Sequence, residues 1–424
     1  MILKKCAAAA AAAVLFAGVL SGCSDGKSGT VSETSAETEI ASETTAVTEA
    51  LTPYDEMVSK AFVSTGNTHR LKQKLEKIRS GEKSAVAFIG GSITEGYTVQ
   101  PDECYAKLTY DFIAGEHTDT VEYINAGISG TPSILGNVRL ERDVLSRSPD
   151  IVFIEFAVND GGEKIYQESY DSMVKTILSQ ENEPAVVLLL NRTKEGHTAQ
   201  DYMKQIGEYY ELPAISTADA LTYGLDNGII KWDDYYNDSS HPSPEGHKFF
   251  LELITHCFEE FEKDGTDNPD YIVKPLGKHS APYANAVLAE ADYDNSDENL
   301  QITDLGAFAK QASGLSGFTK GWAFDPESDA GSFKFTVKAN ALFLVCSRKN
   351  SDAMGKIEVY INGEKAKTIN LNDPSGWGDP FAYQVIKWQS VKTMEVEVKA
   401  AEGYEDKLIE ILGIAYSSND PVSF

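Results

Sequence analysis

The pattern of hydrophobic and polar residues divides the chain into two folded parts. Between about residues 54 and 264, short apolar runs alternate with longer amphipathic segments. This alternation is typical of an α/β domain in which helices connect the strands of a parallel sheet. We expect strands at residues 84–89, 121–125, 151–156, 185–190 and 214–216, and helices at residues 68–78, 104–114, 136–145, 170–178, 199–210 and 245–261.

The second part has a different pattern. After a polar, irregular stretch over residues 266–282, which we interpret as a linker, the hydrophobic periodicity changes to two. Asn362-Gly363 is a typical hairpin turn between two such runs. The pattern predicts an all-β sandwich domain over residues 283–424, with strands at 333–337, 341–346, 356–361, 367–371, 394–399 and 409–415.

The amino-terminal residues have the pattern of an export signal. Lys4 and Lys5 precede an apolar run over residues 7–20, and small residues follow it, as in a secretory signal peptide. The run ends in Leu20-Ser21-Gly22-Cys23, which resembles a bacterial lipobox. The resemblance implies a lipoprotein signal peptide over residues 1–23, with a lipid on Cys23. An uncleaved membrane helix is the alternative, but the apolar run is short for a bilayer.

Residues 24–52 are rich in Ser, Thr, Ala and Glu and contain almost no large apolar side chain. Such a composition buries too little surface to offset the conformational entropy of folding. We expect a disordered linker that tethers the folded part to the extracellular face of the bacterial membrane. The lipid anchor would be the chain's only attachment to that membrane.

Charge and cysteine content narrow the classes of partner. The formal net charge is −28, and the acidic residues are spread along the chain, which argues against nucleic acid and anionic lipid headgroups as partners. The five cysteines show no close pairing and no C-x-x-C motif, so neither a zinc site nor a disulfide framework is indicated. We therefore expect a neutral substrate, no metal and no cofactor.

Four loops at the carboxyl ends of the expected strands contain residues with catalytic potential. They are Gly91-Ser92, the small-residue loop Asn125-Ala126-Gly127-Ile128-Ser129-Gly130, Asn159, and Asp238-Ser239-Ser240-His241. Each is by itself compatible with an ordinary turn. In a parallel sheet, however, these loops meet at one edge, where they offer a hydroxyl nucleophile, a base, a carboxylate and oxyanion donors.

Taken together, these motifs over residues 85–250 resemble the SGNH or GDSL hydrolase superfamily. The resemblance implies a flavodoxin-like parallel sheet with helices on both faces over residues 53–265. It also implies that Ser92 is the nucleophile, that His241 is the base oriented by Asp238, and that the N–H groups of Ser92 and Gly127 and the Asn159 amide form the oxyanion hole. Two positions depart from the usual motifs, because Gly91 replaces aspartate and Ala157 replaces glycine.

Other residues compete for the role that orients the base. Asp233 and Asp234 lie nearby in sequence, but the spacing of Asp238 from His241 matches the motif better. His247 falls inside the last expected helix, and we interpret it as a structural residue. The order Ser, Asp, His without a Gly-x-Ser-x-Gly motif at Ser92 argues against the α/β-hydrolase fold.

The carboxyl-terminal part contains runs around residues 357–363 and 409–414 that resemble the jelly-roll modules attached to carbohydrate esterases. Aromatic rings stack on sugars, so Trp377, which lies between glycines, is a candidate substrate contact. Core packing is the alternative for Trp377, as it is for Trp322 and Trp388.

These features predict a secreted, lipid-anchored serine esterase that removes acyl groups, in particular O-acetyl groups, from an acylated polysaccharide or oligosaccharide. A lipase or lysophospholipase of the same fold is one alternative. A non-catalytic, glycan-binding lipoprotein is the other. The acetyl-esterase hypothesis is favoured because the sequence shows neither a long amphipathic lid nor an apolar run beside the expected active-site loops.

Overall fold

Six strands form a sheet whose central members are buried on both faces. The computed structural model describes residues 51–293 and 297–419. Within these residues the sheet has the order β1-β6-β5-β4-β2-β3. The strands are β1 (Phe62–Ser64), β2 (Ser84–Gly90), β3 (Val121–Gly127), β4 (Ile151–Glu155), β5 (Ala185–Leu190) and β6 (Ala214–Ser216). All five predicted strands are present, and they run parallel to one another.

The strand β1 was not expected from the sequence. It has three residues, none of them fully buried, and it pairs with β6 in the antiparallel direction. The sheet is therefore parallel except at this edge. A three-residue strand is too short to show a periodic pattern, so only its pairing with β6 identifies it.

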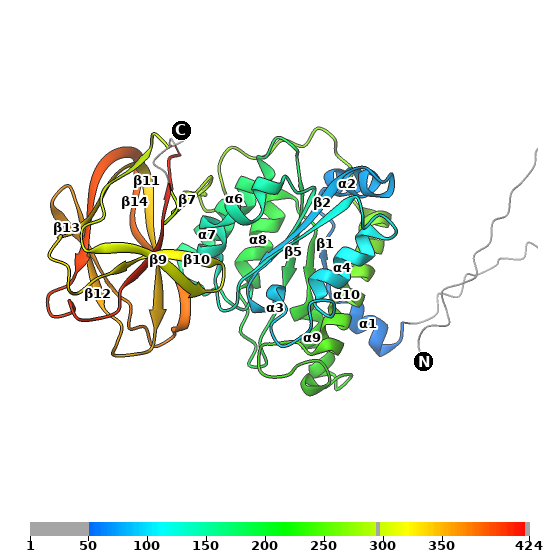
Figure 1. The fold of residues 1–424 in the computed structure, drawn as a ribbon. Helices are drawn as coiled ribbons and strands as arrows, with labels where there is room; N and C mark the ends of the chain where they lie inside the picture. Colours follow the sequence, from blue (N-terminus) through cyan, green and yellow to red (C-terminus); the bar gives the residue numbers. More distant parts are fainter. Residues whose placement is uncertain (1–50, 294–296, 420–424) are drawn as a thin grey trace, which may run out of the picture. The chain divides into compact units, whose positions relative to one another are not determined.

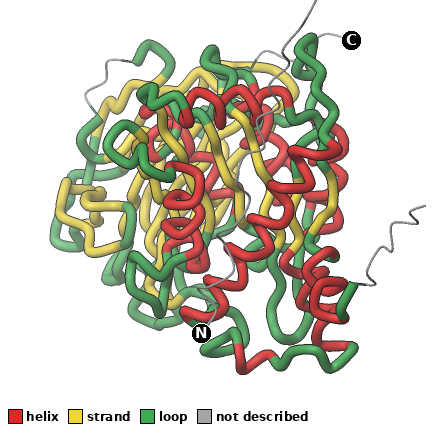
Figure 2. The backbone as a smooth tube through the Cα atoms, turned by 90° about the vertical axis from the view of Figure 1, so that its right-hand side faces the viewer, coloured by secondary structure: helices red, strands yellow, loops and turns green. Residues whose placement is uncertain are grey.

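Helices cover both faces of the sheet (Figures 1 and 2). Along β2, Phe88 points into a core with α2, α4 and α10, whereas Ile89 points into a core with α7 and α8. This alternation explains why every residue of β2 is buried. The longer helices are α2 (His69–Arg79), α4 (Tyr105–Ala114), α7 (Lys164–Leu178), α8 (Gln200–Tyr210), α9 (Thr217–Asp226) and α10 (Pro244–Asp264).

The shorter elements differ most from the sequence prediction. The single helix expected over residues 136–145 is divided into α5 (Ser133–Val138), α6 (Leu140–Asp143) and the 3₁₀ turn η1 (Leu145–Arg147). The helices α1 (Pro53–Ser59) and α9 were not expected. Thr52, which the sequence assigned to the disordered linker, is the N-cap of α1 and accepts a hydrogen bond from the Asp55 N–H.

The predicted signal peptide, the lipidation site Cys23 and most of the predicted linker lie outside the described residues. In the part of the chain that the structure does describe, no helix combines the length and the apolar composition that spanning a membrane requires.

In the carboxyl-terminal part, which we call the β lobe (residues 287–419), all pairs of described strands are antiparallel. Its strands follow the order β13-β12-β14-β11-β15-β10-β9, while β7 pairs with β15 and β8 with β11. They are β7 (Val287–Glu290), β8 (Leu300–Asp304), β9 (Phe308–Leu315), β10 (Phe318–Phe324), β11 (Phe333–Lys349), β12 (Lys356–Ile361), β13 (Glu364–Asn370), β14 (Trp377–Ala400) and β15 (Glu410–Ser417). This arrangement confirms the predicted all-β fold class.

One detail of the β lobe follows directly from the sequence, and another does not. Asn362 and Gly363 both have positive φ and connect β12 to β13, as the hairpin prediction requires. The two strands expected at 333–337 and 341–346 are one continuous strand, β11. It passes a register shift between Ala339 and Ala341 without ending.

The β lobe packs against the α/β lobe (residues 51–264) through an apolar cluster. Ile134, Leu135 and Val138 of α5 contact a core that includes Phe318 and Phe343 of the β lobe. Two ion pairs also cross this interface, one between Arg142 and Glu290 at 2.8 Å and the other between Lys387 and Glu168 at 2.7 Å.

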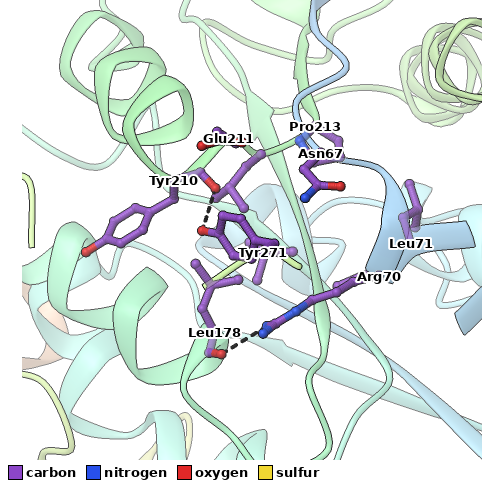
Figure 3. A pocket seen from close by; sticks show the side chains of 11 residues that line it. Asn67, Arg70, Leu71, Leu178, Tyr210, Glu211, Pro213 and Tyr271 are labelled. Carbon is purple, nitrogen blue, oxygen red and sulfur yellow. Dashed lines mark hydrogen bonds between the residues drawn. The ribbon is translucent and has the colours of Figure 1, made fainter. Parts of the chain in front are cut away.

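The segment between the two lobes, residues 265–286, has no helix or strand but is held by specific hydrogen bonds. The buried Asp171 carboxylate accepts hydrogen bonds from the backbone N–H groups of Lys278, His279 and Ala281. Figure 3 shows Tyr271 beside a small cavity of about 20 Å³, with its hydroxyl donating to the Tyr210 carbonyl at 2.8 Å. These contacts hold the connection against the α/β lobe.

Candidate active site

Ser92 lies where β2 turns into the short helix α3 (Ser92–Glu95). It is the first residue of α3 and is nearly buried. The two preceding glycines are required by close packing: a Cβ at Gly90 would lie 2.1 Å from Thr94 Oγ1, and a Cβ at Gly91 would lie 2.2 Å from Asn159 Oδ1. A side chain at position 91 would therefore collide with the Asn159 amide in this arrangement.

The structure brings Ser92, His241 and Asp238 together in a hydrogen-bonded line. His241 Nε2 lies 3.0 Å from Ser92 Oγ, and His241 Nδ1 lies 2.7 Å from Asp238 Oδ2. With the proton on Nδ1, the imidazole donates to the carboxylate and Nε2 is ready to accept the serine proton. This is the geometry that activates a serine nucleophile.

The Asp238 carboxylate is stabilised in its charged form. Partial burial alone would raise its pKa, but hydrogen bonds from the His241 ring and from the backbone N–H groups of Ser240 and His241 outweigh burial, so the pKa is lowered. The Asp238 carbonyl accepts a 2.7 Å hydrogen bond from the buried Trp232 indole. Asp238 is thus held through both its side-chain carboxylate and its backbone carbonyl.

The alternative residues near His241 have other contacts. Asp233 is largely exposed and pairs with Lys194 at 3.1 Å, while Asp234 accepts from the Lys231 N–H in the 3₁₀ turn η2 (Trp232–Asp234). His247 is fully buried, and its Nδ1 accepts a hydrogen bond from the Tyr105 N–H at 3.0 Å. Burial lowers the pKa of His247 to about 4, so it is neutral at physiological pH.

A cavity of about 320 Å³ opens above Ser92 Oγ. Its lining residues come from both lobes and are Ser92, Tyr97, Ser129, Gly130, Val158, Asn159, Ser240, His241 and Trp377. The Asn159 side chain thus lies in the same cavity as the serine and the histidine. Such an amide is a suitable hydrogen-bond donor for an oxyanion.

The sequence analysis expects the Gly127 N–H in the oxyanion hole, but the structure places it elsewhere. The Gly127 N–H donates to Asn125 Oδ1 at 2.9 Å, and Gly127 lines a neighbouring cavity that includes Arg139 rather than the one above Ser92. Gly130, three residues later in the same loop, lines the Ser92 cavity instead. Among the described residues, no acceptor is bonded to the Gly130 N–H. The sequence offered two glycines in this loop, and the pattern did not distinguish them.

Two aromatic residues form the outer walls of the cavity. Trp377 is 56% exposed and comes from the start of β14, so the β lobe contributes to this cavity. Tyr97 is 54% exposed, and its ring meets the His241 ring edge-on at 4.9 Å. The sequence reasoning missed Tyr97, because only the turn after Ser92 brings it beside the histidine.

The other two candidate tryptophans have structural surroundings. Trp322 is fully buried in the core of the β lobe. Trp388 packs partly against the same core, and the Lys392 ammonium lies 5.1 Å from its ring centre. Neither of them lines the cavity above Ser92.

A buried carboxylate lies beneath the nucleophile turn. Glu155, at the end of β4, accepts a hydrogen bond from Thr94 Oγ1 at 3.0 Å and is completely buried. Burial raises the pKa of Glu155 to about 7, although the hydrogen bond from Thr94 and the nearby polar groups of Asn191 and Gly91 oppose this shift. The sequence analysis did not single out Glu155, although it is the one charged residue in the apolar run over residues 151–158.

Within residues 51–293 and 297–419, no three His, Cys, Asp or Glu side chains gather in an arrangement suited to a metal ion.

The fold and the Ser-His-Asp geometry define a serine hydrolase on a parallel α/β sheet. Residues 88–249 match the sequence profile of the GDSL-like lipase/acylhydrolase family. They form a GDSL-type acylhydrolase domain, and the protein is a hydrolytic esterase of this type.

Individual proteins resemble the chain over different lengths. An arylesterase of Vibrio mimicus is 25% identical over 170 residues, which are 39% of this chain and 84% of that protein. A two-domain esterase (CEX) active on acetylated mannans matches with a TM-score of 0.73 and 25% identity, over 86% of this chain and 99% of the other. Its structure co-crystallized with mannopentaose matches over the same shares, with a TM-score of 0.73 and 26% identity. The structural similarity therefore extends over both lobes.

Proposed function

We propose that the protein is a serine carbohydrate esterase that removes O-acetyl groups from an acylated polysaccharide, with acetylated mannan or xylan as the substrate class. One observation carries this proposal: the 320 Å³ cavity has Ser92 and His241 at its base and exposed aromatic rings, Tyr97 and Trp377, at its mouth. A cavity of this size has room for an acylated sugar ring, and flat aromatic rings suit a sugar. The similarity to an esterase active on acetylated mannans supports the same substrate class.

In the proposed mechanism, Ser92 Oγ attacks the ester carbonyl carbon while His241 Nε2 takes the serine proton. The carbonyl π electrons move to oxygen, and the resulting oxyanion accepts hydrogen bonds from the Asn159 amide and the N–H groups of Ser92 and Gly130. Asp238 stabilises the imidazolium that forms.

The tetrahedral intermediate then collapses. The bond to the sugar oxygen breaks, and His241 donates its proton to that oxygen, so a free sugar hydroxyl leaves and an acetyl ester remains on Ser92. A water molecule, deprotonated by His241, attacks this ester. Acetate is released and the serine recovers its proton.

The lipase alternative predicts a different surface around the site. Among the described residues, the large hydrophobic side chains that are exposed at the cavity are the aromatic Tyr97 and Trp377, and no exposed aliphatic side chain accompanies them. A series of nitrophenyl esters separates the two functions. Peak activity at acetyl supports the proposal, whereas peak activity at octanoyl or longer supports the lipase.

Release of acetate from acetylated mannan, xylan and peptidoglycan tests the substrate class. We expect release from mannan or xylan by the native protein and at least a thousandfold lower rate for Ser92→Ala. Equal rates for the two proteins would contradict the serine mechanism. No hydrolysis of any ester by the native protein would favour the glycan-binding alternative.

We further propose that the protein is exported and anchored through a lipid on Cys23, as the lipobox-like sequence Leu20-Ser21-Gly22-Cys23 suggests. The predicted division of the chain into a hydrolase domain over residues 53–265 and a β-sandwich domain over residues 283–424 also stays a prediction. Metabolic labelling with a radioactive fatty acid tests the anchor: the native chain should become labelled in a bacterial host and Cys23→Ala should not. Labelling of both would contradict Cys23 as the attachment site.

A further inference from the structure

The carboxylate of Glu95 joins the nucleophile helix to the loop that contains Gly130. Glu95 is the last residue of α3, the helix that begins at Ser92. Its Oε2 accepts a 2.9 Å hydrogen bond from the Ser129 backbone N–H and a second, short hydrogen bond from the Ser129 hydroxyl. The residue directly before Gly130 is therefore held twice by one carboxylate oxygen.

Close packing adds to this connection. A Cβ at Gly127 would lie 2.1 Å from the Glu95 backbone nitrogen, so the end of β3 lies directly against α3 with no room for a side chain. The loop thus contacts α3 through its backbone at Gly127 and through the Glu95 carboxylate at Ser129.

The other Glu95 oxygen contacts the β lobe. Ser316, in the turn between β9 and β10, donates its hydroxyl to Glu95 Oε1 at 3.3 Å. The neighbouring Gly317 is packed so closely that a Cβ there would lie 2.3 Å from Ile128 Cδ1. The same loop of the α/β lobe is therefore fixed by Glu95 on one side and by the β9–β10 turn on the other.

A buried cation interacts with Glu95, although its own ion pair is with Asp143 at 2.8 Å. The fully buried Arg139 guanidinium interacts electrostatically with Glu95 and donates a hydrogen bond to the Gly90 carbonyl at 3.2 Å, immediately before the nucleophile turn. A negative carboxylate in this half-buried position accepts stronger hydrogen bonds than a neutral oxygen would.

We propose that Glu95 is a positioning residue for the oxyanion hole: it fixes the Ser129-Gly130 peptide so that the Gly130 N–H faces the oxygen that becomes negative during attack by Ser92. The inference rests on the proposed esterase function. It predicts that Glu95 acts on the transition state rather than on substrate binding, because Glu95 itself does not line the cavity.

The test compares Glu95→Ala, Glu95→Asp and Glu95→Gln with the native protein on nitrophenyl acetate. We expect kcat to fall about 10- to 100-fold for alanine and for aspartate, which is too short to reach Ser129, with KM changed less than threefold. Glutamine keeps an acceptor oxygen and should recover kcat to within about fivefold. Glu103→Ala is the matched control, because the Glu103 carboxylate is half-buried like that of Glu95 but accepts its hydrogen bond from the nearby Gln100 N–H rather than from the Ser129 loop.

A second measurement separates positioning from a general structural role. Methylboronic acid forms a tetrahedral anionic adduct with an active serine. Its affinity for Glu95→Ala should therefore fall by the same factor as kcat. The melting temperature of Glu95→Gln should stay near that of the native protein. If Glu95→Ala does not fold, the kcat values of Glu95→Asp and Glu95→Gln test the positioning role, because only the glutamine variant should keep kcat near the native value.

The outcomes for this inference and for the esterase proposal are distinct. If Ser92→Ala is inactive but Glu95→Ala and Glu95→Asp keep native kcat, the positioning role is wrong and the esterase proposal stands. Unchanged boronate affinity alongside a reduced kcat would also overturn the positioning role. If Ser92→Ala is as active as the native protein, the proposed function fails and this inference fails with it.

Discussion

The Trp377 indole lies against the backbone of Gly130. Gly130 has a φ of +70°, and a Cβ at this position would lie 2.6 Å from Trp377 Nε1. The β lobe and the loop of the α/β lobe therefore meet at a residue that lines the cavity above Ser92. Any change in this contact reaches both the aromatic wall and the proposed oxyanion donor.

We predict that Gly130→Ala lowers kcat on nitrophenyl acetate by about 10- to 100-fold, because the added methyl group must displace either Trp377 or the Gly130 peptide. Positive φ also disfavours alanine, and Gly228→Ala controls for this effect: Gly228 has a φ of +64° but nothing within 4 Å of its Cβ position. Equal kcat values for the two variants would show that the contact does not matter for catalysis.

The hydrogen bond between Asp238 and His241 gives a second prediction. Asp238→Asn should lower kcat by about a thousandfold or more, since an amide does not stabilise the imidazolium and favours the wrong tautomer. Asp233→Asn, which changes an exposed carboxylate paired with Lys194, is the control and should retain native kcat. Steady-state kinetics on nitrophenyl acetate measure kcat of both variants. A similar fall in kcat for both would contradict the assignment of Asp238 as the residue that orients His241.

Trp377 gives a prediction that depends on the substrate. Trp377→Ala should raise KM for acetylated mannan oligosaccharides about tenfold while changing KM for nitrophenyl acetate less than threefold, because the small ester has no sugar ring to stack on the indole. Trp377→Phe keeps an aromatic face and should show an intermediate KM. If Trp377→Ala raised KM equally for both substrates, Trp377 would have a structural role instead.

The raised pKa of Glu155 makes stability depend on pH. The pKa is about 7 in the folded protein against an ordinary value of 4.5, so between these pH values the folded protein holds a proton that the unfolded chain has released. Stabilisation by this proton is complete below pH 4.5 and is lost as the pH rises through 7. The free energy of unfolding of Glu155→Gln should therefore rise relative to that of the native protein as the pH increases, by on the order of 3 kcal/mol between pH 4.5 and 8.

Urea denaturation of Glu155→Gln and the native protein at each pH measures this difference. The comparison at equal pH is needed because buried His247 acts in the opposite direction: its pKa is lowered to about 4, so its contribution is lost as the pH falls from 6.5 towards 4. A stability difference between the two proteins that is constant with pH would rule out the Glu155 titration.

The sequence identified the elements whose signals are local. The run over residues 84–89 is apolar on both faces, and β2 is indeed buried on both faces. The hairpin at Asn362-Gly363 was predicted because both positions require positive φ. By contrast, the helix expected over residues 136–145 is interrupted after Val138, and α5 packs against the β lobe, a contact that no local periodicity reports.

The residues of the candidate site likewise separate into those that the local sequence identified and those that only the tertiary structure revealed. The sequence by itself determined that Ser92, Asn159, Asp238 and His241 follow strands or precede the last helix, because loop order and motif spacing are local properties of the chain. Only the tertiary structure decided that Gly130 rather than Gly127 lines the cavity, and that Tyr97 and Trp377 flank it. The physical reason is that the direction of a backbone N–H and the neighbours of a side chain depend on contacts between distant segments, here Glu95 with Ser129 and Trp377 with Gly130.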